Sequence, residues 1–133
     1  MGPTTQRRIA VTQRRIRVAL ADDSSSLREL LSLLLEDDGG FELVGAAADG
    51  AELLDLAIRE HPELVLLDLT MPVLDGMTTL SRLRPLLPQA RLVVFTGCDE
   101  PAARRQALAL GADDYIDKSV GVLDLLARLR SGS

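Results

Sequence analysis

Aromatic residues are scarce in this sequence: they make up 2% of its 133 residues, and tryptophan is absent. Hydrophobic residues nevertheless reach 47%, so the core must be built from leucine, valine, isoleucine and alanine. The single cysteine, Cys98, excludes an internal disulfide. No run approaches the roughly 18 consecutive apolar residues of a membrane span, and the N-terminus does not resemble a signal peptide. These absences lead us to expect a cytoplasmic protein without a membrane segment.

Charge is divided unevenly along the chain. Residues 1–17 contain five arginines and no acid, so the net charge of −5 leaves the remaining 116 residues at −10. We therefore predict a flexible basic tail over residues 1–14 and one domain over residues 15–131, with no output domain in this chain. An acidic folded part argues against direct binding of nucleic acid.

Lysine is rarer still, because Lys118 is the only lysine among fifteen basic residues. Arginine presents a broad planar fork of donors, whereas lysine is a compact point charge. The one lysine therefore indicates a site that needs the compact cation.

Apolar segments that read as strands alternate with segments of helical periodicity. The predicted strands cover residues 16–21, 41–46, 64–67, 91–95 and 114–117. A predicted helix follows each strand, after Ser24–Ser26, at Asp49-Gly50, over 77–83, from Pro101 to about Leu110, and around Val122–Leu129. This alternation predicts an α/β fold: a flavodoxin-like, doubly wound parallel sheet with strand order 2-1-3-4-5.

Local signals refine the expected helices. Ser26 and Glu29 have the spacing of a capping box, and Pro85 with Pro88 is expected to close the third helix. Leu33, Leu35 and Leu123 lie off the main apolar stripes, which predicts exposed positions or part of a docking face.

Polar residues follow four of the five predicted strands. Asp22-Asp23 ends the first, Asp68 the third, Thr96 the fourth and Lys118 the fifth. In such sheets functional groups gather at the carboxyl ends of the strands, so these side chains should converge. Carboxylates 4 Å apart repel by about 4 kcal/mol at an effective dielectric of 20, so the cluster needs positive charge.

Two cations would satisfy that need. Lys118 supplies one, and an all-oxygen ligand set suits Mg²⁺ as the other. The predicted ligands are Asp22, Asp23, Asp68 and the backbone carbonyl of Thr70.

Flanked by two cations, Asp68 could attack a phosphorus centre, with Thr96 and the N–H of Gly97 bonding the phosphoryl oxygens. Three alternatives stay open. One is a phosphohydrolase with an aspartyl nucleophile, although Thr70 stands where such enzymes usually place a second acid. The others are a phosphorylation-independent interaction module and an ion-pair network without chemistry.

The motifs at these strand ends resemble the receiver (response regulator, CheY-like) domain of bacterial two-component systems. The resemblance covers about residues 15–130 and is carried by Asp22-Asp23, the segment 68–76, Phe95-Thr96-Gly97 and the segment 111–118. It implies Asp68 as phosphoacceptor, Asp22 and Asp23 as magnesium acids with Asp23 favoured as the direct ligand, and Lys118 as a phosphoryl contact. It also implies a switch pair, Thr96 and Tyr115, in which Tyr115 rotates inward. The pattern is most similar to receivers of LuxR/NarL-type regulators.

The resemblance further implies a phosphodonor and an output. The donor would be the phosphohistidine of a sensor histidine kinase or phosphotransfer protein. Phosphorylation would change the face formed by the fourth helix, fifth strand and fifth helix, which could also form a homodimer. DNA would be reached only through an output domain, and the chain would be no enzyme beyond accepting and slowly losing its own phosphoryl group. Ser119 departs from the family, which commonly has a proline there behind a cis peptide bond.

Overall fold

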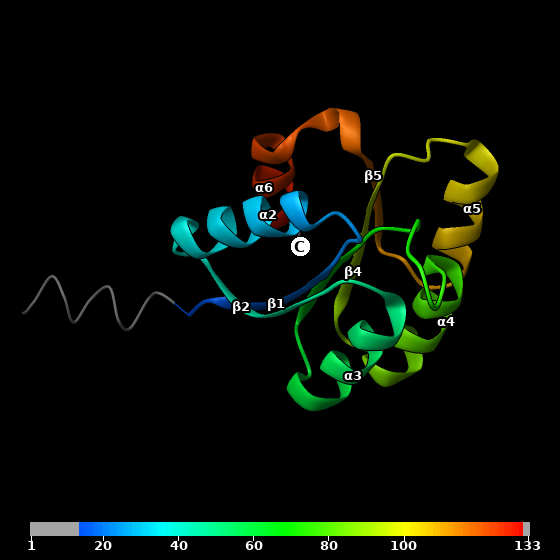
Figure 1. Ribbon diagram of the computed structural model, residues 1–133, viewed down its shortest axis with the longest axis horizontal. Coiled ribbons are helices and arrows are strands. Elements are labelled where there is room, and N and C mark those ends of the chain that lie inside the picture. Colours follow the sequence, from blue (N-terminus) through cyan, green and yellow to red (C-terminus); the bar gives the residue numbers. More distant parts are fainter. Residues whose placement is uncertain (1–13, 132–133) are drawn as a thin grey trace, which may run out of the picture.

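The computed structural model describes residues 14–131 and contains a five-stranded parallel sheet with helices on both faces (Figure 1). The elements are β1 (Ile16–Ala21), α2 (Ser25–Asp38), β2 (Phe41–Ala47), α3 (Gly50–Glu60), β3 (Leu64–Leu67), α4 (Gly76–Leu86), β4 (Arg91–Thr96), α5 (Pro101–Ala109), β5 (Asp114–Asp117), the 3₁₀ helix η1 (Lys118–Val120) and α6 (Val122–Ser131). The strand order β2-β1-β3-β4-β5 confirms the predicted fold class. The predicted tail lies outside the described residues except for Arg14, which pairs with Glu63.

Two hydrophobic clusters lie on opposite faces of the sheet, because successive strand residues point to opposite sides. Val18 and Leu20 of β1 join the cluster under α2 and α6, whereas Ala19 and Ala21 join the cluster under α3, α4 and α5. Figure 1 shows the same layers, with α2 and α6 above the sheet and α3 and α4 below it. No helix within residues 14–131 is long and apolar enough to cross a membrane.

The predicted capping box at the start of the first helix is wrong. The N-cap is Ser24, whose side chain accepts a hydrogen bond from the Leu27 N–H. Asp22 explains the difference, because its Oδ1 accepts from the Ser24 N–H at 2.9 Å and fixes the chain just before the helix.

The third predicted helix is longer than expected, since α4 continues through Pro85 to Leu86. The Leu87 N–H still bonds to the Leu83 carbonyl at 2.8 Å, and Leu83 and Leu87 are buried. Packing of this last turn outweighs the backbone hydrogen bond that a proline removes.

The apolar side chains off the predicted stripes divide into two groups. Leu33 and Leu123 are 65% and 70% exposed, as expected, but Leu35 is fully buried. Leu35 lies four residues after the buried Leu31, on the same face of α2, and joins the cluster that includes Phe41 and α6.

Arginine side chains link the edge of the sheet where the strands begin, its N-terminal edge, to the ends of the helices. Arg17 donates to the Glu60 and His61 carbonyls at the end of α3, and Arg91 donates to the Arg128 and Leu129 carbonyls near the end of α6. Arg84 donates to the carbonyls of Leu87, Ala90 and Gly111 at 2.6–2.9 Å. A forked guanidinium suits this bridging of several carbonyls, which accounts for the preference for arginine here.

Candidate functional site

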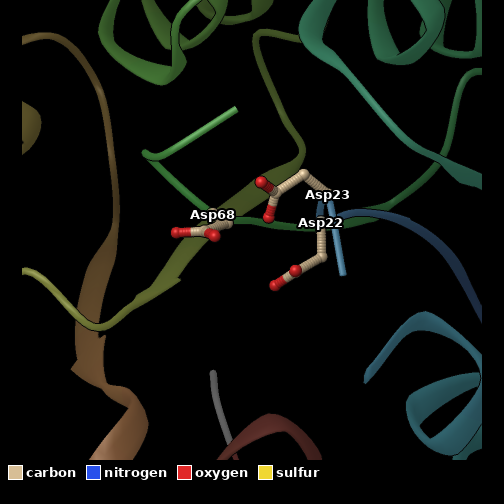
Figure 2. A group of neighbouring side chains, drawn as sticks. All are labelled: Asp22, Asp23 and Asp68. Carbon is tan, nitrogen blue, oxygen red and sulfur yellow. The ribbon is translucent and has the colours of Figure 1, made fainter. Parts of the chain in front are cut away.

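Three carboxylates meet at the carboxyl edge of the sheet, just after the ends of the neighbouring strands β1 and β3. Oxygen atoms of Asp22, Asp23 and Asp68 lie within 4.8 Å of one another (Figure 2). Backbone hydrogen bonds position two of them: the Asp22 N–H bonds to Ala47 at 3.1 Å, and the Asp68 N–H to Ala21 at 3.0 Å. Asp22 and Asp68 are only 2% and 3% exposed, whereas Asp23 is open to solvent.

Lys118 bridges the two buried carboxylates. Its Nζ lies 2.9 Å from Asp22 Oδ2 and 3.1 Å from Asp68 Oδ2. Since β4 lies between β3 and β5, the lysine side chain spans the end of β4 to reach them. Burial by itself would lower the pKa of Lys118, but its hydrogen bonds to Asp22 and Asp68 outweigh that effect and raise the pKa above its usual value.

The donor set fits a divalent cation of the hard, oxygen-binding kind. Three carboxylates and one ammonium leave the cluster with two uncompensated negative charges. No histidine and no sulfur contributes to this group, which favours Mg²⁺ over zinc. Asp22, Asp23 and Asp68 are the side chains that would hold such an ion.

The loop after Asp68 folds back on the site. The Thr70 N–H donates to Asp68 Oδ1 at 3.2 Å, and the Gly76 N–H donates to the Leu69 carbonyl at 3.1 Å. A side chain at residue 76 would place its Cβ 2.3 Å from Leu69 Cα, so only glycine allows this close approach. Between these contacts Val73 has a φ of +68°, a strained conformation for a β-branched residue.

The predicted switch pair lies on the next two strands, with Thr96 at the end of β4 and Tyr115 within β5. Thr96 is fully buried at the end of β4, and its Oγ1 accepts from the Cys98 N–H at 3.4 Å. Tyr115 of β5 is buried, and its hydroxyl donates to the Cys98 carbonyl while the Arg104 guanidinium lies 5.3 Å from the ring centre. Burial, together with the contact to Cys98, raises the pKa of Tyr115 to about 12. Thr96 and Tyr115 are thus both joined to residue 98.

Gly97 leaves open space beside these groups, since a side chain there would meet no atom within 4 Å.

The segment after Lys118 uses a backbone donor at residue 119, where the family commonly has proline. Asp117 accepts a hydrogen bond from the Ser119 N–H at 2.7 Å, a donor that proline lacks, and η1 follows. No cis peptide bond occurs between residues 14 and 131.

Arg28 is a site residue that the sequence analysis missed. Its Nη1 donates to the backbone carbonyl of Asp22 at 2.7 Å. The available signal was its place in the first turn of a helix that follows the acid pair, because helical side chains point back toward the N-terminus.

Comparison with known proteins finds a family model and relatives that match this chain over most of its length. The family model described as "Response regulator receiver domain" matches residues 18–130. The protein-glutamate methylesterase/protein-glutamine glutaminase 1 of Geobacter sulfurreducens is 40% identical over 108 residues, which are 80% of this chain and 30% of that protein. The chain thus spans about a third of the length of this relative.

Solved structures agree with that match. The signal receiver domain of NarL from Mycobacterium tuberculosis is 30% identical with a TM-score of 0.80, covering 90% of this chain and 98% of that chain. A chain of the CheX-CheY-BeF3-Mg+2 complex from Borrelia burgdorferi is 28% identical with a TM-score of 0.80, and the match covers 87% of this chain and 87% of that chain.

Proposed function

Because this chain belongs to the response regulator receiver domain family of bacterial two-component systems, we propose that Asp68 accepts a phosphoryl group from a phosphohistidine. The observation that carries this proposal is the position of Lys118, with its ammonium between Asp22 and the acceptor Asp68. The donor would be a sensor histidine kinase or a phosphotransfer protein in the cytoplasm.

In the proposed step, an Asp68 carboxylate oxygen attacks phosphorus. The new O–P bond forms as the N–P bond to the donor histidine breaks, and the imidazole leaves with the electron pair and takes up a proton. Lys118 compensates negative charge on the phosphoryl oxygens, and the Thr96 hydroxyl and the Gly97 N–H donate to them. Magnesium held by Asp22, Asp23, Asp68 and the carbonyl of Thr70 would supply further positive charge, with Asp23 favoured as a direct ligand.

The proposed output is a population shift. Once phosphorylated, Asp68 would draw Thr96 toward it and would bias Tyr115 toward an inward position. Tyr115 is available for such a change at the neighbouring strand, where it is buried and donates a hydrogen bond to the Cys98 carbonyl. The face of α5, β5 and α6, the fourth helix, fifth strand and fifth helix, would carry the signal to an output or to a second copy of the domain. The domain would control an output domain or target and would not itself be an enzyme beyond accepting and losing its phosphoryl group. DNA would be contacted only through such an output.

Mass spectrometry tests the acceptor directly. Incubation with acetyl phosphate and Mg²⁺ should add the mass of one phosphoryl group to the wild-type protein and none to Asp68→Asn. The matched control is Asp55→Asn, which changes an exposed carboxylate on α3 and should be phosphorylated like the wild type. A mass gain that persists in Asp68→Asn would contradict the proposal.

Two further measurements separate the alternative functions. Many turnovers of a phosphomonoester per protein molecule would favour a phosphohydrolase. Failure of Mn²⁺ to broaden the NMR signals of residues around Asp68 would favour an interaction module that has kept only the fold.

A further inference from the structure

Arg28 connects the first turn of α2 to the end of β1. Its backbone N–H donates to the Ser24 carbonyl at 2.9 Å, and its Nη1 donates to the Asp22 carbonyl at 2.7 Å. The residue is half-buried, so the guanidinium is partly withdrawn from competing water.

The other polar groups of Asp22 are already bonded. Its N–H donates to Ala47, its Oδ1 accepts from the Ser24 N–H, and its Oδ2 meets Lys118. The carbonyl that Arg28 holds belongs to the peptide unit that joins Asp22 to Asp23. Because a peptide unit is planar, the direction of this carbonyl also fixes where the Asp23 Cα lies.

Asp23 depends on that restraint more than its neighbours do. It is exposed, and within residues 14–131 no hydrogen bond or ion pair holds its carboxylate. Its oxygen nevertheless lies within 4.8 Å of oxygens of both Asp22 and Asp68 (Figure 2). The direction of the backbone before Asp23, together with the rotamer of its side chain, therefore sets where the carboxylate lies.

We propose that Arg28 is a positioning residue of the acid cluster, which orients the Asp22–Asp23 peptide and thereby directs the Asp23 carboxylate for binding of a divalent cation. This inference rests on the proposed function, since it assigns Arg28 a part in the same cation site. Arg28 does not contact the cation; it acts through Asp23.

Charge and geometry predict opposite effects of removing the guanidinium. By Coulomb's law alone, loss of a positive charge beside the cluster strengthens the binding of a cation. If Arg28 positions Asp23, its loss weakens binding instead. The sign of the change therefore distinguishes the two roles.

The test measures Mn²⁺ affinity from the electron paramagnetic resonance signal of free Mn²⁺, with Mg²⁺ as competitor. We expect Arg28→Met to bind Mn²⁺ about tenfold more weakly than the wild type, the usual range for loss of a group that orients a metal ligand. Arg28→Lys, which can still donate to the carbonyl, should recover part of the loss. The control is Arg105→Met, which removes an exposed arginine on α5 and should leave the affinity unchanged.

Urea unfolding of each variant is measured first by circular dichroism. If Arg28→Met does not fold, Arg28→Leu, which also lacks a hydrogen-bond donor, replaces it under the same criterion. Equal or tighter Mn²⁺ binding by Arg28→Met would overturn the positioning role while leaving the proposed function intact. Absence of Mn²⁺ binding by the wild type would instead overturn the cation site itself, and the positioning role with it.

Discussion

Lys118→Met is the substitution that tests the charge balance of the site most directly. Methionine keeps an unbranched side chain but removes the ammonium that lies 2.9 Å from Asp22 and 3.1 Å from Asp68. Both carboxylates are almost fully buried, so water cannot replace the lost partner.

The expected loss of stability follows from these distances. Carboxylates within 4.8 Å of each other repel by about 3 kcal/mol or more at an effective dielectric near 20. Removing one partner of a buried ion pair lowers stability by about 3–5 kcal/mol. Because Asp23 is exposed and partly screened, we expect Lys118→Met to lower the free energy of unfolding by about 3 kcal/mol at pH 7 without divalent cations.

Urea unfolding followed by far-ultraviolet circular dichroism in EDTA measures this difference. Excess Mg²⁺ should stabilise the variant more than the wild type, since it binds a more negative cluster, and adding Asp68→Asn should recover part of the loss. Arg105→Met is the matched control, because it also removes one positive charge but should change stability by less than about 0.5 kcal/mol.

The pH dependence gives a second check with a definite sign. The pKa of Lys118 is raised above its ordinary 10.5, so the folded state keeps its proton when the unfolded state begins to lose it. The contribution of Lys118 is therefore fully present below about pH 10.5 and falls as pH rises through the folded pKa, where wild type and variant should converge. A Lys118→Met variant as stable as the wild type in EDTA at pH 7 would refute the reasoning.

Three further predictions concern Tyr115 and the loop after Asp68. The single tyrosine should titrate near pH 12 in the folded protein and near pH 10 in urea, as measured by absorbance at 295 nm. Its contribution to stability is present below pH 10 and is lost as pH rises from 10 through 12, and a folded midpoint near 10 would contradict the buried hydroxyl. Val73→Gly should raise the free energy of unfolding by about 1 kcal/mol. It relieves about 1–3 kcal/mol of backbone strain, which exceeds the cost of the greater entropy of glycine in the unfolded chain, and the 79% exposed side chain loses no packing. Gly76→Ala should lower it by about 2 kcal/mol, because its Cβ would overlap backbone atoms of Leu69; an unchanged urea midpoint would disprove either loop assignment.

The sheet and the ends of its strands were predictable from the sequence because apolar strand segments alternate regularly with segments of helical periodicity, and each of these patterns is local. The segment 16–21 is apolar apart from Arg17, the segment 64–67 is wholly apolar, and an aspartate follows each of them. Parallel topology then brings those aspartates together. Asp22, Asp23, Asp68 and Lys118 accordingly converge as predicted. Their roles in phosphoryl transfer and the magnesium site stay predictions.

Helix ends and long-range contacts were less predictable, because tertiary packing decides them. Pro85 signalled the end of a helix, yet burial of Leu83 and Leu87 carries α4 past it. Ser24, Ser25 and Ser26 offer similar caps by composition, and the side chain of Asp22 selects Ser24. Arg28 was missed because its place in the first turn of a helix is a weak signal, shared by arginines that face solvent and by arginines that bond to the carbonyl after the preceding strand.

The arginine contacts at the N-terminal edge join the starts of the strands to the ends of neighbouring helices. Arg17 and Arg91 bind carbonyls of α3 and α6, and Arg84 of α4 binds carbonyls in the loops before β4 and β5. If these contacts hold the N-terminal edge in place, a backbone displacement that begins at Asp68 would be largest at the carboxyl edge, near residues 96–98 and 118–121. An output domain that binds near the N-terminal edge would respond little to that displacement. One that binds near residues 96–98 and 118–121 would respond to most of it.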